Sequence, residues 1–356
     1  MKSRAQGGFV LVATIWVLAA MVLFMGYVAY WSAQIQDSAL RQAESVRWSF
    51  EQQSTMSTLV YLGATRRMSY AGLTLGEVTS LTMEDEFNPF SADPFVTMGG
   101  ELRLDGTPYQ GLGGTRFSVQ DTGPLVGLKV VNSSKRLESL LRHYEVSGRE
   151  VRRLIAAMID YTDRDDTRTL DGYESRGYEA NGQLRPTNRF LVSPSQVSNV
   201  MGWDAALGDR LPDFLDQVTI HPGNKNNFNT LTPVGMQTLG YLENSSIERI
   251  LDHRRDAVFK SLGDVNRVAE VVVPADSLLF TSIPDPFLRV RIWRPSSRQE
   301  EWIGIRFTPL SGFAPWEIDY RINRQRQPES TNEALKPADE TLAANIPQSV
   351  LFRPAL

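Results

Sequence analysis

The feature that most constrains this chain is an uncharged, almost wholly apolar stretch near its N-terminus, from Gly7 to Gln36. At ~1.5 Å per residue, a helix from Phe9 to Trp31 would reach roughly 34 Å, enough to cross a hydrocarbon core of about 30 Å. Two basic residues, Lys2 and Arg4, precede the stretch, whereas the charges that follow it are mixed in sign. The positive-inside rule therefore predicts a single span with a cytoplasmic N-terminus and an exported remainder.

A short basic leader, residues 1–8, directly precedes the apolar stretch and ends in two glycines before Phe9. It resembles the signal of type IV prepilins, which a prepilin peptidase cleaves after the glycine before methylating the new N-terminal phenylalanine. The resemblance implies processing between Gly8 and Phe9, at a backbone that a missing Cβ leaves accessible. Two alternatives stay open: a secretory signal peptide, which normally has a shorter apolar core and a small-residue cleavage site, and a plain uncleaved anchor.

The fifth residue after the glycine is Ala13. Type IV pilins typically carry a glutamate at this position, which the resemblance implies would pair with the N-terminal amine of the subunit above. A subunit with nothing above it would bury that carboxylate unpaired, at a cost on the order of 2.5–3.5 kcal/mol. Ala13 therefore predicts a subunit that caps a filament. The alternative is an anchor helix that never assembles.

Composition limits the partners and the sources of stability. The 356 residues, 42% hydrophobic and 22% charged, leave room for one large or two small globular domains beyond the span. The net charge of −4 with interspersed signs gives no indication of nucleic acid as a partner. The absence of cysteine excludes disulfides and thiolate metal sites, so stability must come from packing or a hard metal ion.

Hydrophobic periodicity predicts an α+β fold. The helical period continues beyond the span to Leu62, which indicates one long N-terminal helix packed on an antiparallel sheet. The predicted strands, separated by turns at residues 106–108 and 121–123 and by a helical block, are Glu101–Leu104, Thr115–Gln120, Leu125–Val131, Leu278–Ser282, Phe287–Trp293 and Glu301–Phe307. Because both β-rich regions could share one sheet, the block between them is expected to be an all-helical domain inserted into the sheet region.

The domain boundaries follow from these patterns. Helix-start signals in the insertion are Ser147 with Glu150, Ser193 with Pro194 (a helix that Gly202 would end), Thr232 with Pro233, and Ser245. The expected segments are the leader 1–8, the transmembrane half of the N-terminal helix 9–36, the outer half and first β part 37–131, the inserted helical domain 132–268, the second β part 269–326 and an extended, proline-rich tail 327–356.

The chemically richest stretch runs from Asp160 to Glu174 and contains six carboxylates. Such groups repel one another unless they are solvated, paired with arginines or gathered around a cation. The stretch overlays partly on an EF-hand loop, but Arg168 replaces the required glycine. Two interpretations stay open: a solvated loop paired with Arg164, Arg168 and Arg176, and an oxygen-ligand calcium site. The candidate calcium ligands are Asp163, Asp165, Asp166, Asp171 and Glu174.

Catalytic constellations are missing from the sequence. The three histidines have no metal-ligand spacing, no serine lies in a G-x-S-x-G elbow, and the glycines at 111–114 lack the strand and helix of a phosphate loop. We therefore do not expect an enzyme. A membrane-anchored periplasmic enzyme remains the least favoured alternative, since scattered side chains could still meet in three dimensions.

Several segments together resemble the large minor pseudopilin of the bacterial type II secretion system, the GspK family. They are Gly8–Phe9 with the apolar helix, Phe117–Asn132 (FSVQDTGPLVGLKVVN), Ile159–Asp166 (IDYTDRDD) and Asn229–Pro233. The resemblance implies a pilin-like fold with an inserted helical domain, calcium near the aspartates, and a place at the tip of a short periplasmic pseudopilus. A minor pilin of a type IV pilus, which shares the leader, is the main alternative.

The resemblance also implies partners and a location. The expected partners are other minor pseudopilins and the major pseudopilin, the prepilin peptidase, and the inner-membrane secretion platform that drives protein export across the outer membrane. The chain would be a single-pass inner-membrane protein with its bulk in the periplasm.

Overall fold

The computed structural model describes residues 7–75, 93, 95–97, 99–274, 280–309 and 311–326. The predicted tail 327–356, most of the leader and part of the predicted strand Leu278–Ser282 lie outside the described residues. The chain forms two compact units, Met1–Gln53 and Ser54–Leu356.

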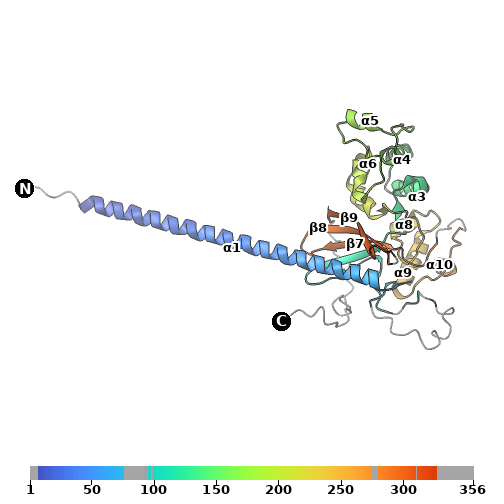
Figure 1. Ribbon diagram of the computed structural model, residues 1–356, viewed down its shortest axis with the longest axis horizontal. Coiled ribbons are helices and arrows are strands. Elements are labelled where there is room, and N and C mark those ends of the chain that lie inside the picture. Colours follow the sequence, from blue (N-terminus) through green and yellow to red (C-terminus); the bar gives the residue numbers. More distant parts are fainter. Residues whose placement is uncertain are drawn as a thin grey trace, which may run out of the picture. The chain divides into compact units, whose positions relative to one another are not determined.

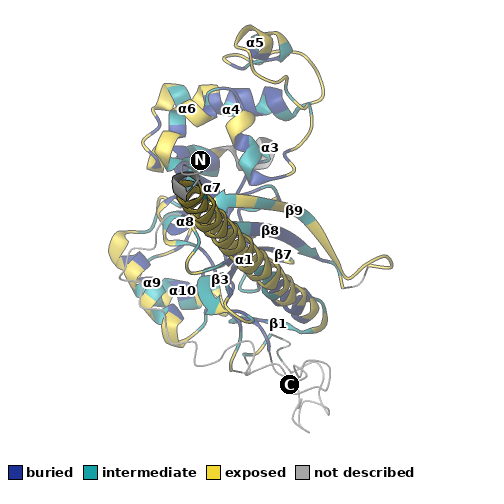
Figure 2. Cartoon of the chain, turned by 90° about the vertical axis from the view of Figure 1, so that its left-hand side faces the viewer, coloured by how far each residue is buried: buried dark blue, intermediate teal, exposed yellow. Residues whose placement is uncertain are grey.

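The first unit consists of the greater part of one helix, α1 (Gly7–Thr65), which continues into the second unit (Figure 1). Its large apolar side chains, from Val10 to Trp31, are exposed (Figure 2). Among the described residues, α1 is the one helix long and apolar enough to cross a membrane. An apolar surface of this kind needs a nonpolar environment, which the hydrocarbon core of a membrane provides.

The second unit contains a five-stranded antiparallel sheet in the order β3-β4-β7-β8-β9. Its strands are β3 (Asp105–Gln110), β4 (Arg116–Asp121), β7 (Phe287–Trp293), β8 (Gln299–Phe307) and β9 (Trp316–Gln325). β4 pairs with β7, with Asp121 opposite Leu288, although more than 160 residues separate them in sequence. The helices of the intervening segment are therefore inserted between two neighbouring strands, and the expected antiparallel sheet is present.

The last turns of α1 pack on one face of this sheet. Met56, Leu59 and Leu62 belong to a buried apolar cluster that includes Phe117 of β4 and Ile305 of β8. Every residue of this group is at most 5% exposed. Burial of these side chains explains why the soluble end of α1 is fixed on the sheet, since apolar area removed from water stabilises by ~25 cal/mol per Å².

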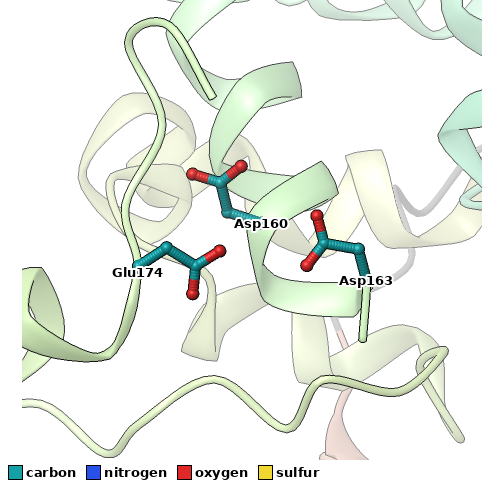
Figure 3. A group of neighbouring side chains, drawn as sticks. All are labelled: Asp160, Asp163 and Glu174. Carbon is teal, nitrogen blue, oxygen red and sulfur yellow. The ribbon is translucent and has the colours of Figure 1, made fainter. Parts of the chain in front are cut away.

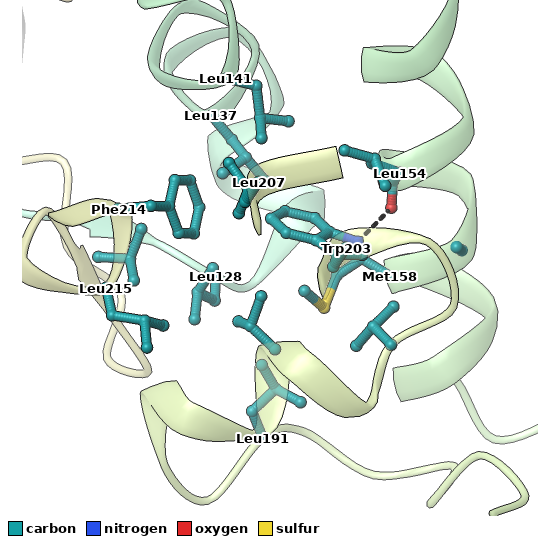
Figure 4. Close-up of a cluster of buried hydrophobic side chains, with 14 of the residues drawn as sticks. Leu128, Leu137, Leu141, Leu154, Met158, Leu191, Trp203, Leu207, Phe214 and Leu215 are labelled. Atoms are coloured by element: carbon teal, nitrogen blue, oxygen red, sulfur yellow. Dashed lines mark hydrogen bonds between the residues drawn. The ribbon is translucent and has the colours of Figure 1, made fainter. Parts of the chain in front are cut away.

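The insertion is built from short helices around two apolar clusters. They are α3 (Val130–His143), α4 (Gly148–Thr162), α5 (Ser175–Ala180), η1 (Pro194–Asn199), α6 (Trp203–Leu207), η2 (Gly208–Arg210), α7 (Leu211–Asp216), α8 (Pro233–Gln237), α9 (Asn244–Asp256) and α10 (Leu262–Ala269). In the first cluster Trp203 is fully buried among leucines, and its indole N–H donates to the carbonyl of Leu154 at 2.9 Å (Figure 4). The second cluster surrounds Phe228 and Phe259.

Of the four predicted helix starts, two have the expected side-chain caps. The Ser147 hydroxyl accepts from the Glu150 N–H at 3.3 Å, and the Thr232 hydroxyl accepts from the Gly235 N–H at 2.9 Å.

Ser193 precedes η1 but makes no side-chain cap bond, and Ser245 was wrongly expected to start a helix, since α9 begins at Asn244 after Glu243. Gly202 was wrongly expected to end a helix. It has φ +84° and directly precedes α6, because glycine adopts this left-handed conformation without a Cβ penalty.

The strand predictions before the insertion were partly wrong. Glu101–Leu104 contributes only a bridge between Leu102 and Leu73, of the short hairpin β1 (Met68–Ser69) and β2 (Gly72–Leu73). The true edge strand β3 runs through the predicted turn 106–108. Gly106 has φ +85° beside a bulge, and an edge strand can accommodate Pro108 because its missing N–H leaves no ladder bond unmade.

The insertion is also not all-helical. Within the predicted strand Leu125–Val131 only β5 (Val126–Gly127) is extended, and it pairs in parallel with β6 (Val218–Thr219) inside the insertion. α3 already begins at Val130. Two-residue strands leave no alternating pattern that a sequence could reveal. β9, which carries no strand prediction of its own, has a register shift that interrupts its alternation.

Candidate metal centre

Three carboxylates meet where α4 ends and α5 begins. Asp160 lies in the last turn of α4, Asp163 is its C-terminal cap, and Glu174 is the residue before α5. The amphipathic helix α4 buries one side, which includes Leu154 and Met158. Residues three apart on a helix face the same way, so Asp160 and Asp163 project toward the returning chain that carries Glu174.

The three side chains converge (Figure 3). One oxygen of each lies within 4.8 Å of the others. Asp160 is fully buried and Glu174 is 7% exposed. Both oxygens of Asp160 accept from the N–H of Thr169, at 3.1 and 3.2 Å. A Cβ on Gly172 would lie only 2.1 Å from Asp160 Oδ2, so the loop reaches this carboxylate because residue 172 is glycine.

The centre is short of positive charge and of hydrogen-bond donors. Asp163 Oδ1 and both carboxylate oxygens of Glu174 are buried without a hydrogen-bond partner. Burial, reinforced by Asp160, Asp163 and Asp166, raises the pKa of Glu174 to about 7. Burial and the neighbouring Asp165 likewise raise the pKa of Asp163. Carboxylate oxygens without donors are the ligands that Ca²⁺ and Mg²⁺ prefer, so a hard divalent cation fits this site.

The structure brings together two of the five predicted ligands, Asp163 and Glu174. The other three lie on the exposed loop between α4 and α5. Asp165 Oδ1 accepts from the Thr167 N–H at 2.8 Å, Asp166 Oδ1 accepts from the Ser175 hydroxyl at 3.4 Å, and Asp171 has φ +68°. The sequence analysis counted Asp160 among the six carboxylates of the stretch but left it out of the candidate ligands. The sequence signal that could have identified Asp160 is its position three residues before Asp163, which places both side chains on one side of the helix.

The other predicted functional residues lie in the first turns of α1. These are Gly8 and Phe9, where processing is expected, and Ala13, which is half-exposed. Among the described residues, no ion pair joins Arg164, Arg168 or Arg176 to the acidic loop, although the solvated-loop interpretation had expected such pairs.

Comparison with known proteins connects this region to a family. Residues 122–216 match the model of the family described as type II secretion system (T2SS), protein K. This segment, about a quarter of the chain, is therefore similar to protein K of that secretion system. No curated protein is significantly similar to the chain. A solved structure, the GspK-GspI-GspJ complex of the enterotoxigenic Escherichia coli type 2 secretion system, contains a similar fold. The match has a TM-score of 0.50 and 15% identity over 82% of this chain and 99% of that one.

The protein K region begins beside a second buried carboxylate, at the end of β4. Asp121 is 1% exposed. Its Oδ1 accepts from the N–H groups of Gly123 (2.9 Å) and Asp285 (3.2 Å). Its Oδ2 accepts from the Thr230 hydroxyl at 2.8 Å and the Asn227 amide at 3.4 Å. Two segments that are far apart in the sequence, at 121–123 and 227–230, therefore meet at one carboxylate.

Proposed function

We propose that this chain is a protein K of the type II secretion system, a minor pseudopilin at the tip of the periplasmic pseudopilus, where it helps to initiate assembly of that filament. The observation that carries the proposal is Ala13 on an apolar helix that otherwise suits filament packing. A glutamate there would remain unpaired at the top of a filament, in a low-dielectric helix bundle. The inserted helices support the same position, because a bulky insertion at a tip meets no subunit above it.

Cysteine crosslinking along α1 tests the tip position. The chain contains no cysteine, so single cysteines at Val10, Ala13 or Val17 give unambiguous products with single-cysteine partner subunits. We expect crosslinks to subunits on the lower axial side only. Crosslinks to pseudopilins on both axial sides would show an internal subunit and contradict the proposal.

Processing at Gly8 belongs to the same proposal. Cleavage by prepilin peptidase between Gly8 and Phe9 would free the amine of Phe9 to attract the glutamate of the next subunit entering below. We expect Gly8→Val to block cleavage because a β-branched residue crowds the scissile backbone, and Gly8→Ala to be cleaved more readily. N-terminal sequencing reads the outcome, and a wild-type chain that keeps Met1 beside an active peptidase would contradict it.

We propose calcium as the cation of the acidic centre. Asp160, Asp163 and Glu174 supply its inner oxygens, and water and main-chain carbonyls complete the six to eight ligands that calcium takes. The exposed Asp165, Asp166 and Asp171 add negative charge around the ion without ligating it. The cation would neutralise the carboxylates that join α4 to α5. Its role is then to hold the loop of the insertion in one conformation.

The proposed partners are the other minor pseudopilins at the tip of the pseudopilus, on the periplasmic side of the inner membrane, and the major pseudopilin in the filament below that tip. The similar crystal structure holds GspK with GspI and GspJ, which supports a complex of this kind here. The secretion platform of the inner membrane completes the proposed assembly, and α1 anchors the chain in that membrane.

A further inference from the structure

Two apolar side chains at the start of β9, Trp316 and Ile318, form an exposed strip, and the loop before them carries a third exposed one, Phe313. Phe313 is fully exposed, Trp316 is 41% exposed and Ile318 is 44% exposed. β9 is the last strand in the order of the sheet, so among the described residues one of its edges has no neighbouring strand. Large apolar side chains grouped in this way mark interaction sites more often than scattered ones do.

A bulge places the strip on one particular face of the sheet. Ile318 lies opposite Ile305 and Trp316 lies opposite Phe307, whereas the next pair joins Tyr320 to Gly304 after a register shift. Directly opposed residues share a face, so Trp316 and Ile318 lie on the face of Ile305 and Phe307. The shift moves Tyr320 to the other face, where its ring covers Gly304 and a Cβ on that glycine would lie 2.3 Å away.

That face is already a helix-binding surface. Ile305 and Phe307 pack in the cluster that receives the end of α1. A Cβ on Gly63 of α1 would lie 2.2 Å from the Phe307 ring, which shows how closely α1 approaches β8. Trp316 and Ile318 extend the row of apolar side chains on β8 onto the neighbouring strand, β9. A second helix, lying beside the end of α1 on the uncovered part of the sheet, would fit this strip.

A positive charge beside the strip, on Arg321, indicates which side chains the docking helix would carry. Arg321 lies opposite Ile303 on the same face, and 45% of its side chain is exposed although it pairs with Glu301 at 3.3 Å. We propose that the strip is the docking surface for an amphipathic helix of another pilin-like subunit, with an apolar stripe on Trp316 and Ile318 and an acidic residue toward Arg321. This inference rests on the proposed function, since it identifies where a partner pseudopilin binds.

Site-specific photocrosslinking tests the surface. Full-length chain carrying p-benzoylphenylalanine at position 316 or 318 is coexpressed with the GspI-like and GspJ-like subunits of its own system. Position 272 is the control, because Val272 is 82% exposed and lies outside the strip. We expect crosslinks that map by mass spectrometry to a helix of one partner, about tenfold above the control. Crosslinks to residues 327–356 of the same chain, to a second copy, to a partner strand, or at the control level would overturn the proposal.

A substitution separates this inference from the proposed function. The double variant Trp316→Thr and Ile318→Thr keeps residues that suit a strand, and it should bind the copurified partners about tenfold more weakly. Val272→Thr is the matched control and should bind like the wild type. Equal thermal midpoints confirm that the variants are folded. If the double variant binds like the wild type, the docking surface is wrong. If the wild type binds neither partner, the proposed function itself fails.

Discussion

The two buried carboxylate sites differ in how their oxygens are satisfied. At the end of β4, both oxygens of Asp121 receive hydrogen bonds from four donors of three separate segments. At the end of α4, both oxygens of Glu174 and one of Asp163 have no hydrogen-bond partner although they are buried. A buried polar group without partners is costly. The first site is therefore complete as it stands and structural, whereas the second has the free carboxylate oxygens that could hold a cation.

Removing the satisfied carboxylate should have the largest effect. Asp121→Ala leaves the N–H groups of Gly123 and Asp285 and the side chains of Asn227 and Thr230 without an acceptor, so we expect a loss of about 4 kcal/mol in the free energy of unfolding. Urea denaturation of the full chain in detergent, followed by tryptophan fluorescence, measures it. Asp121→Asn keeps one carbonyl acceptor and is the matched control, with a loss of about 1 kcal/mol. Equal effects of the two variants would contradict the structural role.

At the acidic centre we expect a gain in stability, which appears when calcium binds. Calcium at a hundredfold excess over its dissociation constant should add ~2.7 kcal/mol to the stability of the wild type, and a chelator should remove it. Glu174→Gln should abolish this gain. Without calcium the same variant should equal or exceed the wild type in stability, because it removes a buried charge from beside Asp160 and Asp163.

Thermal melting with calcium and with chelator measures this second effect, and Asp121→Asn serves as the control that keeps the calcium gain. Equal midpoints for the wild type in millimolar calcium and in chelator would favour the solvated-loop interpretation. A calcium gain that persists in Glu174→Gln would place the ion elsewhere.

The difference between the two sites also explains what could be predicted from the sequence. The acidic stretch is local, so its carboxylates were recognised as a candidate site, and β7 was predicted with its observed bounds Phe287–Trp293. The hydrogen bond from Thr230 to Asp121 spans 109 residues. No local pattern encodes a contact of that separation, although the resemblance had already drawn attention to both segments. The strand predictions around residues 101–131 were wrong for the same reason. Which strand lies at the edge and where a bulge occurs depend on pairing with strands far away in the sequence.

Asp121 should also give the folded protein a specific pH dependence. Burial raises its pKa to about 7, above the ordinary value of 3.8. Between these values the folded state holds a proton that the unfolded state has lost. The contribution of Asp121 to the free energy of unfolding is therefore fully present below about pH 4 and is lost as pH rises toward about 7. We expect wild-type stability to fall by about 1.4 kcal/mol from about pH 5 to about pH 6, relative to Asp121→Asn. Identical pH profiles for the two proteins would show that Asp121 stays ionised, held by its four donors.

The smallest effects should come from the exposed carboxylates, which sharpen the boundary of the acidic centre. Asp165 is exposed and its Oδ1 caps the N–H of Thr167, so Asp165→Asn keeps an acceptor there and should change the free energy of unfolding by about 0.5 kcal/mol or less. Calcium affinity, measured by isothermal titration, should fall by about threefold or less, since an exposed carboxylate acts on a buried cation mainly through screened charge. Asp163→Asn is the matched comparison two residues away. A loss for Asp165→Asn as large as that for Asp163→Asn would mean that the outer loop ligates the ion directly, and the contrast between buried and exposed carboxylates would fail.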